Sequence, residues 1–189
     1  KRKEGYEHVT FTGGEPTLYP RVWESLRLAK ELGYRTFLIS NGAALSMPAF
    51  ADRTLPFIDE LCLSLHGPTA PVHDALTGRS GSFARQLKAF ANVERQARDI
   101  FVLVNTVVSR RNVALLPGIL RLAGRHAKVR HYLASNLAPE GDGLRNYSDL
   151  SVRHEEIARR LPEMSRYARG RGIDLRIFGV PVCALGKYG

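Results

Sequence analysis

The chain has 189 residues, of which 44% are hydrophobic, and its formal net charge is +10. This length and apolar fraction are sufficient for one globular domain with a substantial core. No apolar run approaches the ~20 residues that cross a membrane, and the first residues, KRKEGYEH, lack the apolar core of a secretion signal. We therefore expect a cytoplasmic protein. The excess charge favours a peptide or an acidic small molecule as substrate, whereas the arginine-rich segments are interpreted as solvated helix faces, so we expect neither nucleic-acid nor membrane binding.

Strand-like and helix-like segments alternate along the chain. Strands are predicted at residues 7–12, 34–40, 59–66, 100–108, 128–135 and 173–179. Helices are predicted at residues 20–33, 47–54, 83–98, 113–126 and 152–172, and loops at 67–82 and 136–149. Parallel strands joined by right-handed helical crossovers follow from this order. A complete eight-stranded barrel needs ~250 residues, so the predicted fold is an α/β partial barrel.

Polar residues recur toward the carboxyl ends of four predicted strands. A parallel strand that is buried on both faces reads as a nearly continuous apolar run, and these strands do not. Barrels and open α/β sheets place their ligand sites at the carboxyl ends of strands. We therefore expect a hollow, polar interior that holds a polar ligand. The residues concerned are Thr10, Thr12, Ser40, Cys62, Ser64, His66 and Asn105.

Residues 13–16, Gly-Gly-Glu-Pro, follow the first predicted strand. Glycine weakens a strand and proline removes a backbone donor, so the sequence does not serve sheet stability. Gly13 and Gly14 would let a ligand approach the backbone, Glu15 offers an acceptor suited to an ammonium group, and Pro16 stiffens the exit. The arrangement favours an amino-acid head group. Neither the GxGxxG nor the GxxxxGKS/T spacing of phosphate-binding loops is present.

Four segments follow successive strands and carry a resemblance. They read TGGEPTL at residues 12–18, ISNG at 39–42, LSLHG at 63–67 and NTVVSRRN at 105–112. In this order and at this spacing they resemble the strand-end motifs of radical S-adenosylmethionine (radical SAM) enzymes, and the resemblance extends to residue 135. It implies a TIM-like (β/α)6 partial barrel and an oxidoreductase that uses S-adenosyl-L-methionine and an iron-sulfur cluster of the 4Fe-4S type.

The resemblance also implies which residues bind the cofactor, although it identifies no catalytic residue. Gly13, Gly14, Glu15 and Pro16 would receive the amino group of the methionyl moiety. The other residues implied are Ser40 and Asn41 beside the amino group, Ser64 and His66 at the ribose or carboxylate, Asn105 and Arg110 at a ribose hydroxyl and the carboxylate, and Val107 with residues 132–134, including Tyr132, at the adenine.

The CxxxCxxC loop that holds the cluster in this family is absent from the sequence. Thiolates are the usual ligands of such clusters, and Cys62 with Cys183 cannot replace three closely spaced cysteines. Because the GGEP strand is the second strand of the family, we expect the N-terminal strand and the cluster loop to lie upstream of this chain, and the chain alone to be inactive. We expect a core at residues 1–178 and the start of a C-terminal extension at 179–189, in which Cys183 is a candidate ligand of an auxiliary cluster.

The mechanism implied by the resemblance is reductive cleavage of S-adenosylmethionine at the cluster. The product is a 5'-deoxyadenosyl radical that abstracts hydrogen from the substrate, with a flavodoxin or ferredoxin as electron donor. Two alternatives stay open. One is a cluster-free module that binds a nucleoside or an amino acid without radical chemistry, and the other is a barrel enzyme that uses Glu15 and His66 in acid-base catalysis.

Overall fold

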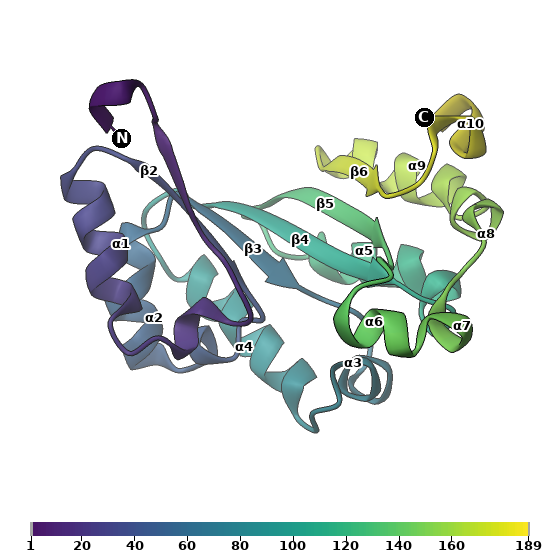
Figure 1. Cartoon of the computed structure of the whole chain (residues 1–189), viewed down its shortest axis with the longest axis horizontal. Helices are drawn as coiled ribbons and strands as arrows, with labels where there is room; N and C mark the ends of the chain where they lie inside the picture. The colour runs from purple at the N-terminus through teal and green to yellow at the C-terminus, as the bar shows by residue number, and fades with distance from the viewer. Residues whose placement is uncertain (1, 189) are drawn as a thin grey trace.

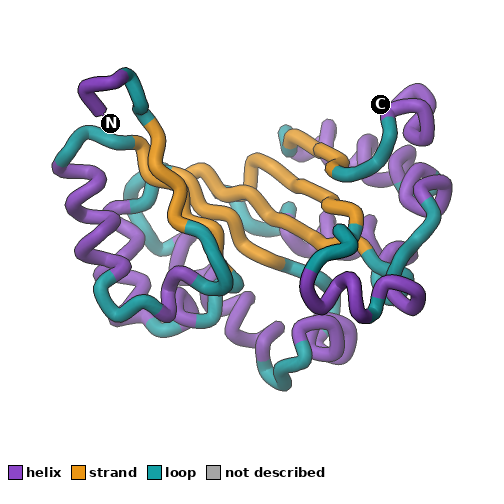
Figure 2. The backbone as a smooth tube through the Cα atoms, viewed as in Figure 1, coloured by secondary structure: helices purple, strands orange, loops and turns teal. Residues whose placement is uncertain are grey.

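The computed structural model describes residues 2–188, and its centre is a sheet of six parallel strands in chain order (Figures 1 and 2). The strands are β1 (His8–Phe11), β2 (Arg35–Ser40), β3 (Glu60–Ser64), β4 (Phe101–Val108), β5 (Val129–Asn136) and β6 (Asp174–Phe178). The helices are α1 (Val22–Glu31), α2 (Pro48–Thr54), α3 (Ala70–Thr77), α4 (Ser82–Glu94), α5 (Leu116–Ala123), α6 (Gly141–Arg145), α7 (Tyr147–Leu150), α8 (His154–Ala158), α9 (Leu161–Arg171) and α10 (Val182–Leu185).

One face of the sheet forms the core together with the main helices. Crossovers between parallel strands are right-handed in nearly all proteins, so strands in strict chain order bring the connecting helices to the same face. Along β4, Val102, Val104, Thr106 and Val108 are buried, while the residues between them are partly exposed. The buried apolar residues of the sheet share one core with residues of α1, α4, α5 and α9. The predicted alternation of parallel strands and helices is confirmed.

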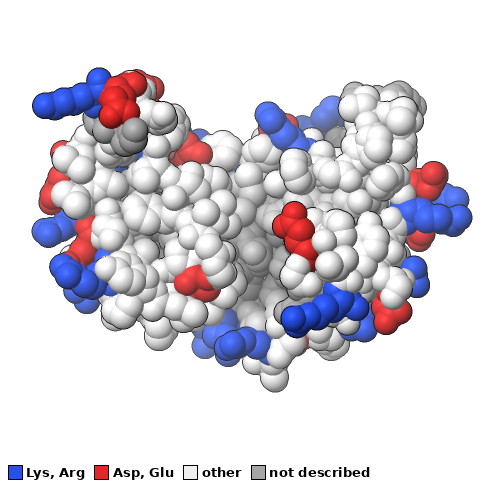
Figure 3. All heavy atoms as spheres, in the orientation of Figure 1, with Lys and Arg blue, Asp and Glu red and all other residues white. Residues whose placement is uncertain are grey.

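The other face of the sheet is open. In the space-filling view the molecule is hollowed at its centre, where Figure 1 shows β2 to β5, and the walls of the hollow are mostly uncharged (Figure 3). The charged side chains seen from this side gather around the rim. This open face corresponds to the hollow interior that the sequence predicts, while its floor at Ile39, Cys62 and Leu103 is apolar.

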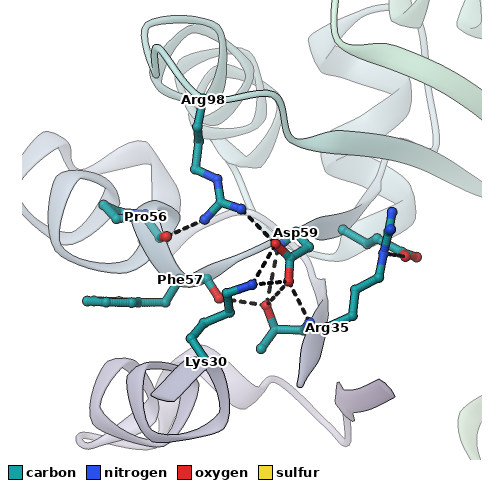
Figure 4. A network of polar contacts seen from close by, with 8 residues as sticks. Lys30, Arg35, Pro56, Phe57, Asp59 and Arg98 are labelled. Atoms are coloured by element: carbon teal, nitrogen blue, oxygen red, sulfur yellow. Dashed lines mark hydrogen bonds and ion pairs between the residues drawn. The ribbon is translucent and has the colours of Figure 1, made fainter. Parts of the chain in front are cut away.

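At the amino ends of the strands, a partly buried ionic cluster joins three elements. Asp59, which precedes β3, accepts hydrogen bonds from Lys30 Nζ at 2.8 and 2.9 Å and from Arg98 Nη2 at 2.6 Å (Figure 4). The backbone N–H of Thr36 donates to the same carboxylate at 2.8 Å. Because this cluster lies at the end of the sheet opposite the strand-end motifs, its contacts serve stability.

Three predicted element assignments are wrong. The predicted loop 67–82 contains α3, and the predicted loop 136–149 contains α6 and α7. The predicted helix 152–172 is divided into α8 and α9, because Pro162 stands in the first turn of α9. In α3, Pro71 lies in the first turn and Gly78 follows the last residue in a left-handed conformation. Both residues are helix-boundary signals that also occur in turns.

No helix within residues 2–188 has the length and apolar character needed to span a membrane. The cytoplasmic location stays a prediction, and so does the division at residue 178. Within the segment predicted as an extension, α10 packs on α8, and its Leu185 is buried.

Candidate functional site

The carboxylate of Glu15 ties the loop after β1 to the loop after β2. Its Oε1 accepts hydrogen bonds from Thr17 N at 3.1 Å, Thr17 Oγ1 at 2.6 Å and Ser40 Oγ at 2.9 Å. Its Oε2 accepts from the backbone N–H of Asn41 at 2.7 Å. Pro16 begins the short 3-10 turn that Glu15 caps. The Gly-Gly-Glu-Pro motif therefore organises two strand ends as well as leaving backbone exposed.

Oε2 is the less engaged of the two carboxylate oxygens, since it has one hydrogen-bond donor against three at Oε1. A carboxylate oxygen has room for a further donor when only one is present. No cation forms an ion pair with Glu15 among the described residues. The rim of the open face thus carries a negative charge that is not neutralised within the part of the chain that the structure describes.

The backbone just before Glu15 is open. Gly13 has a φ of +139°, which side-chain-bearing residues rarely adopt, and a Cβ placed at Gly13 or at Gly14 would meet no atom within 4 Å. Both residues are exposed. The prediction that a ligand can reach this backbone therefore agrees with the geometry.

Ser40 and Asn41 lie beside the motif but not as expected. Ser40 is 3% exposed and belongs to the helix-covered face together with Leu38, whereas Ile39 lies on the open face. The prediction that Ser40 faces the interior is wrong: its hydroxyl donates to Glu15 and accepts from Gly42 N at 3.0 Å. The Asn41 side chain is exposed, and its Oδ1 accepts from Ala43 N. Ser40 therefore supports the site from beneath.

Ser64 and Asn105 share the open face, as predicted. They are partners in the β3–β4 register, and both are partly exposed. Asn105 Oδ1 accepts a hydrogen bond from Ser135 Oγ at 2.8 Å, and Leu133 is the neighbour of Asn105 in β5. One polar row thus crosses β3, β4 and β5 near their carboxyl ends.

His66 stands at the end of this row and is neutral at physiological pH. Burial lowers its pKa, and the neighbouring His73 lowers it further, to about 4. The two rings are stacked, with centroids 5.8 Å apart. Its Nδ1 accepts a hydrogen bond from the backbone N–H of Val107 at 3.3 Å. His66 can therefore bind a ligand as an uncharged imidazole.

Two further residues that the sequence assigned to the site, Arg110 and Tyr132, lie in contrasting places, one exposed and one buried. Arg110 is exposed in the loop after β4, where its guanidinium donates to Ser148 O at 3.3 Å. Tyr132 is fully buried on the helix-covered face, and its hydroxyl is hydrogen-bonded to Thr106 Oγ1 at 2.8 Å. The prediction that Tyr132 frames an adenine is therefore wrong, whereas Val107 is partly exposed and lies on the open face.

The two cysteines occupy different environments, one buried and one exposed. Cys62 is on the open face of β3 but is 5% exposed, and burial raises the pKa of its thiol to about 12. Cys183 is exposed on α10. Among residues 2–188 no group of three or more His, Cys, Asp and Glu side chains could hold a metal ion. The described residues therefore do not fit an iron-sulfur cluster.

Three residues near the site were not predicted from the sequence: His73, Thr106 and Asn112. Each is buried, and each makes side-chain hydrogen bonds at the ends of β3 and β4. Asn112 is the last letter of the motif NTVVSRRN, which was the only signal available for it. The buried polar role of His73 could not be read from its place in a segment predicted as a loop.

Comparison with known proteins places this site in context. The family model of the radical SAM superfamily matches residues 1–114. The chain is similar to the AdoMet-dependent heme synthase of Methanosarcina barkeri, with 30% identity over 161 residues, 85% of this chain and 45% of that protein. It is also similar to the PqqA peptide cyclase of Rhodopseudomonas palustris, with 36% identity over 124 residues, 63% of this chain and 31% of that protein.

Solved structures show the same fold. The structure of Streptococcus suis SuiB bound to S-adenosylmethionine matches with a TM-score of 0.70 and 19% identity over 91% of this chain and 38% of that chain. The chain spans less than half the length of each of these three proteins. Its parallel sheet in chain order agrees with the predicted TIM-like partial barrel. Because the family model covers more than half of its residues, including all four strand-end motifs in full, the chain belongs to the radical SAM superfamily.

Proposed function

We propose that this chain is the S-adenosylmethionine-binding core of a radical enzyme, and that the cofactor binds above the open face at the carboxyl ends of β1 to β4. The superfamily uses S-adenosylmethionine together with a 4Fe-4S cluster. The observation that carries the proposal is the carboxylate of Glu15, which lies beside open glycine backbone and has no cationic partner among the described residues. An ammonium group is the natural complement of that charge.

The remaining polar groups of the open face suit the other parts of the cofactor. Ser64 and Asn105 lie in one row and offer hydroxyl and amide groups to a ribose. His66 adds an uncharged imidazole next to them, and Arg110 supplies an exposed guanidinium at the rim for the carboxylate. These assignments follow the strand order of the sequence motifs. Tyr132 is omitted because it is buried on the opposite face.

The contribution of this chain is binding, orientation and exclusion of water. In the superfamily, S-adenosylmethionine and the reduced cluster together supply a 5'-deoxyadenosyl radical that abstracts hydrogen from a substrate. The described residues do not fit a cluster, so we assign no step of cluster chemistry to them. Ile39, Cys62 and Leu103 are neighbours across β2, β3 and β4 on the open face. They give the interior an apolar floor, which limits access of water to reactive intermediates.

A peptide is the substrate class that we favour. The PqqA peptide cyclase, which is named for the peptide on which it acts, is 36% identical to this chain over 124 residues. The net charge of +10 suits an acidic peptide. A flavodoxin or ferredoxin as electron donor stays a prediction.

The two alternatives differ in their support. A cluster-free binding module agrees with the lack of cluster ligands among the described residues. Acid-base catalysis by Glu15 and His66 is not favoured, because Nδ1 of His66 already accepts a hydrogen bond from Val107 N and burial lowers the pKa of the ring to about 4, far from the operating pH of a general base. Formation of 5'-deoxyadenosine distinguishes the radical enzyme from both.

The test uses the full-length protein, reconstituted anaerobically with iron and sulfide and supplied with S-adenosylmethionine and dithionite. We expect 5'-deoxyadenosine from the native protein. We expect Glu15→Gln to lower its rate about tenfold or more, because loss of the charge removes an ion pair to the ammonium group.

The matched control is Glu31→Gln, an exposed carboxylate on α1 that pairs with Arg27 at 3.7 Å. Thermal unfolding of both variants shows whether the loss in Glu15→Gln comes from a loosened loop. A cluster-loaded protein that forms no 5'-deoxyadenosine excludes the radical enzyme. A full rate in Glu15→Gln excludes the role that we give to this carboxylate.

A further inference from the structure

Where the backbone hydrogen bonds between β3 and β4 end, hydrogen bonds from side chains continue to join the two segments. The last ladder bond in this region runs from Leu65 N to Asn105 O at 2.9 Å. Beyond it, Thr106 Oγ1 donates to Leu65 O at 2.6 Å. The next backbone donor, Val107 N, is directed to the ring of His66 at 3.3 Å. A histidine ring therefore occupies the acceptor position that a strand carbonyl would otherwise fill.

This hydrogen bond determines where the proton of the His66 ring resides. A backbone N–H can only donate, so Nδ1 of His66 must be the unprotonated nitrogen. A neutral imidazole then carries its single proton on Nε2. No described residue is hydrogen-bonded to Nε2, and it is not among the buried polar atoms without a partner. The structure thus leaves one N–H donor on the ring that remains accessible.

His73 and Gly67 hold the His66 segment in place from the side of α3. The backbone N–H of His66 donates to Nδ1 of His73 at 3.1 Å, and the two rings are nearly parallel, at 14°. His73 is 3% exposed. A Cβ at Gly67 would lie 2.6 Å from His73 N, so only glycine lets α3 come this close. The neighbouring helix therefore limits movement of the ring.

Asn112 fastens the same segment from the side of β4. Its Nδ2 donates to His66 O at 3.0 Å and to Val107 O at 2.9 Å, and its Oδ1 accepts from Ser109 N at 2.7 Å. Asn112 is fully buried. One amide thus holds the end of β3 at a set distance from the end of β4, and this distance decides whether Val107 N can reach the His66 ring.

We propose that His66 is held as a single tautomer that donates one hydrogen bond, through Nε2–H, to an oxygen or nitrogen acceptor of the bound ligand, and that Asn112 is the residue that positions it. The identity of the ligand, S-adenosylmethionine, rests on the proposed function. The acceptor then belongs either to its nucleoside or to its carboxylate. Because Nε2–H of His66 can only donate, a ligand that places a hydrogen-bond donor opposite Nε2 would bind poorly.

The tautomer can be tested without any ligand. In the chain with nitrogen-15-labelled histidine, long-range proton-nitrogen correlation separates protonated from unprotonated ring nitrogens. For His66 we expect a protonated Nε2 and an unprotonated Nδ1 that do not change between about pH 6 and 8. A protonated Nδ1, or a fast mixture of both tautomers, overturns the proposal.

Asn112→Asp tests the positioning role with the same signal. The carboxylate cannot donate to His66 O and Val107 O, so we expect the ring of His66 to lose its single tautomer. His126, which stacks on Phe90 at 4.3 Å near the opposite end of the sheet, is the control within the same spectrum. If the His126 signals are kept and those of His66 are unchanged, Asn112 does not position the ring.

The donor can be tested by binding of S-adenosylmethionine, measured by calorimetry on the full-length protein. His66→Gln places an amide N–H near the position of Nε2, whereas His66→Asn reaches only the position of Nδ1. We expect His66→Gln to bind within about threefold of the native protein and His66→Asn to bind about tenfold more weakly. The control is His8→Gln, an exposed histidine at the amino end of β1.

Methylthioadenosine, which keeps the nucleoside but lacks the carboxylate, identifies the acceptor. Equal weakening of both ligands by His66→Asn assigns the acceptor to the nucleoside, and weakening of S-adenosylmethionine alone assigns it to the carboxylate. Weakening of neither overturns the donor proposal. If the native protein binds neither ligand, the proposed function fails and the donor proposal is overturned with it, while the labelled spectrum still decides the tautomer.

Discussion

Two carboxylates show how the same chemistry serves different ends of this sheet. Glu15, at the carboxyl ends, receives four hydrogen bonds and no cation among the described residues. Asp59, at the amino ends, lies between Lys30 and Arg98, and its side chain is 15% exposed (Figure 4). The compensated carboxylate stabilises the fold, and the uncompensated one is free to bind a cation.

The Asp59 cluster predicts a defined pH dependence of stability. Burial by itself raises the pKa of Asp59, but hydrogen bonds from Lys30, Thr36 N and Arg98 outweigh it and hold the pKa at about 2. A carboxyl group whose pKa is lowered on folding stabilises the protein above its unfolded pKa of about 3.9 and loses this contribution as pH falls through its folded value. We expect Asp59→Asn to lower the free energy of unfolding by about 2 kcal/mol at pH 7.

Urea unfolding at a series of pH values measures this difference. It should disappear between about pH 4 and pH 2, because the native carboxyl becomes protonated there. Asp52→Asn, which removes an exposed pair with Arg95, is the control and should change stability much less than Asp59→Asn does, because solvent screens exposed ion pairs. A loss in Asp59→Asn that is equally large at pH 2 and pH 7 contradicts an electrostatic origin.

The sequence predicted which residues follow the strands at the rim of the open face, but it did not predict to which face of the sheet each side chain points. Gly13 and Gly14 leave open backbone beside Glu15, as the motif indicates, and their contact with a ligand stays a prediction. Tyr132 lies on the helix-covered face and not on the open face. The reason is that the β4–β5 register shifts between Val102 and Leu103, where β5 accommodates one additional residue. A bulge of this kind reverses every later side chain in the strand, and simple alternation does not reveal it.

At the scale of elements, the contact between α3 and the end of β3 shows how a loop-like sequence forms a helix. The segment contains several glycines and prolines, which predict a loop, yet α3 begins at Ala70 and ends at Thr77. Asp74 on α3 accepts hydrogen bonds from the N–H groups of Gly81 and Phe83, which joins α3 to α4. The local signals, Pro71 and Gly78, also occur in turns, and the contacts of Asp74 that favour the helix are seen only in the folded chain, so the sequence alone did not distinguish a helix from a loop.

The close contact at Gly67 predicts a stability effect. In Gly67→Ala the new Cβ would approach His73 N to 2.6 Å, and α3 must move away from the strand. We expect a loss of about 1 to 3 kcal/mol in the free energy of unfolding, which is typical of overpacking, as measured by urea denaturation.

Gly170→Ala is the matched control for this substitution. Gly170 lies in α9, where a Cβ would meet no atom within 4 Å. Alanine there should leave stability unchanged or raise it by up to about 1 kcal/mol, because alanine favours helix over glycine. Equal effects of the two substitutions would contradict close packing at Gly67.

At the scale of the whole molecule, the fold could be predicted because each strand and its helix form a local unit. Strand and helix periodicities, with short connections, leave few topologies other than parallel strands in sequence, and the structure has that order. The sequence predicted a ligand site at the carboxyl ends of the strands, but the ionic cluster at their amino ends could not be predicted. It depends on which charged groups meet across β1 to β4, and partners such as Lys30 and Asp59 are 29 residues apart.

The central claim is that S-adenosylmethionine binds to the carboxyl-end rim of the open face. The most direct test is a titration of the nitrogen-15-labelled chain with S-adenosylmethionine, followed by backbone amide signals. We predict that the largest shifts occur at Gly13, Gly14, Asn41 and His66, at the rim, while Gly33, after α1 at the amino ends, stays unchanged. Shifts confined to the amino ends, or the absence of any shift at ligand saturation, would contradict the account.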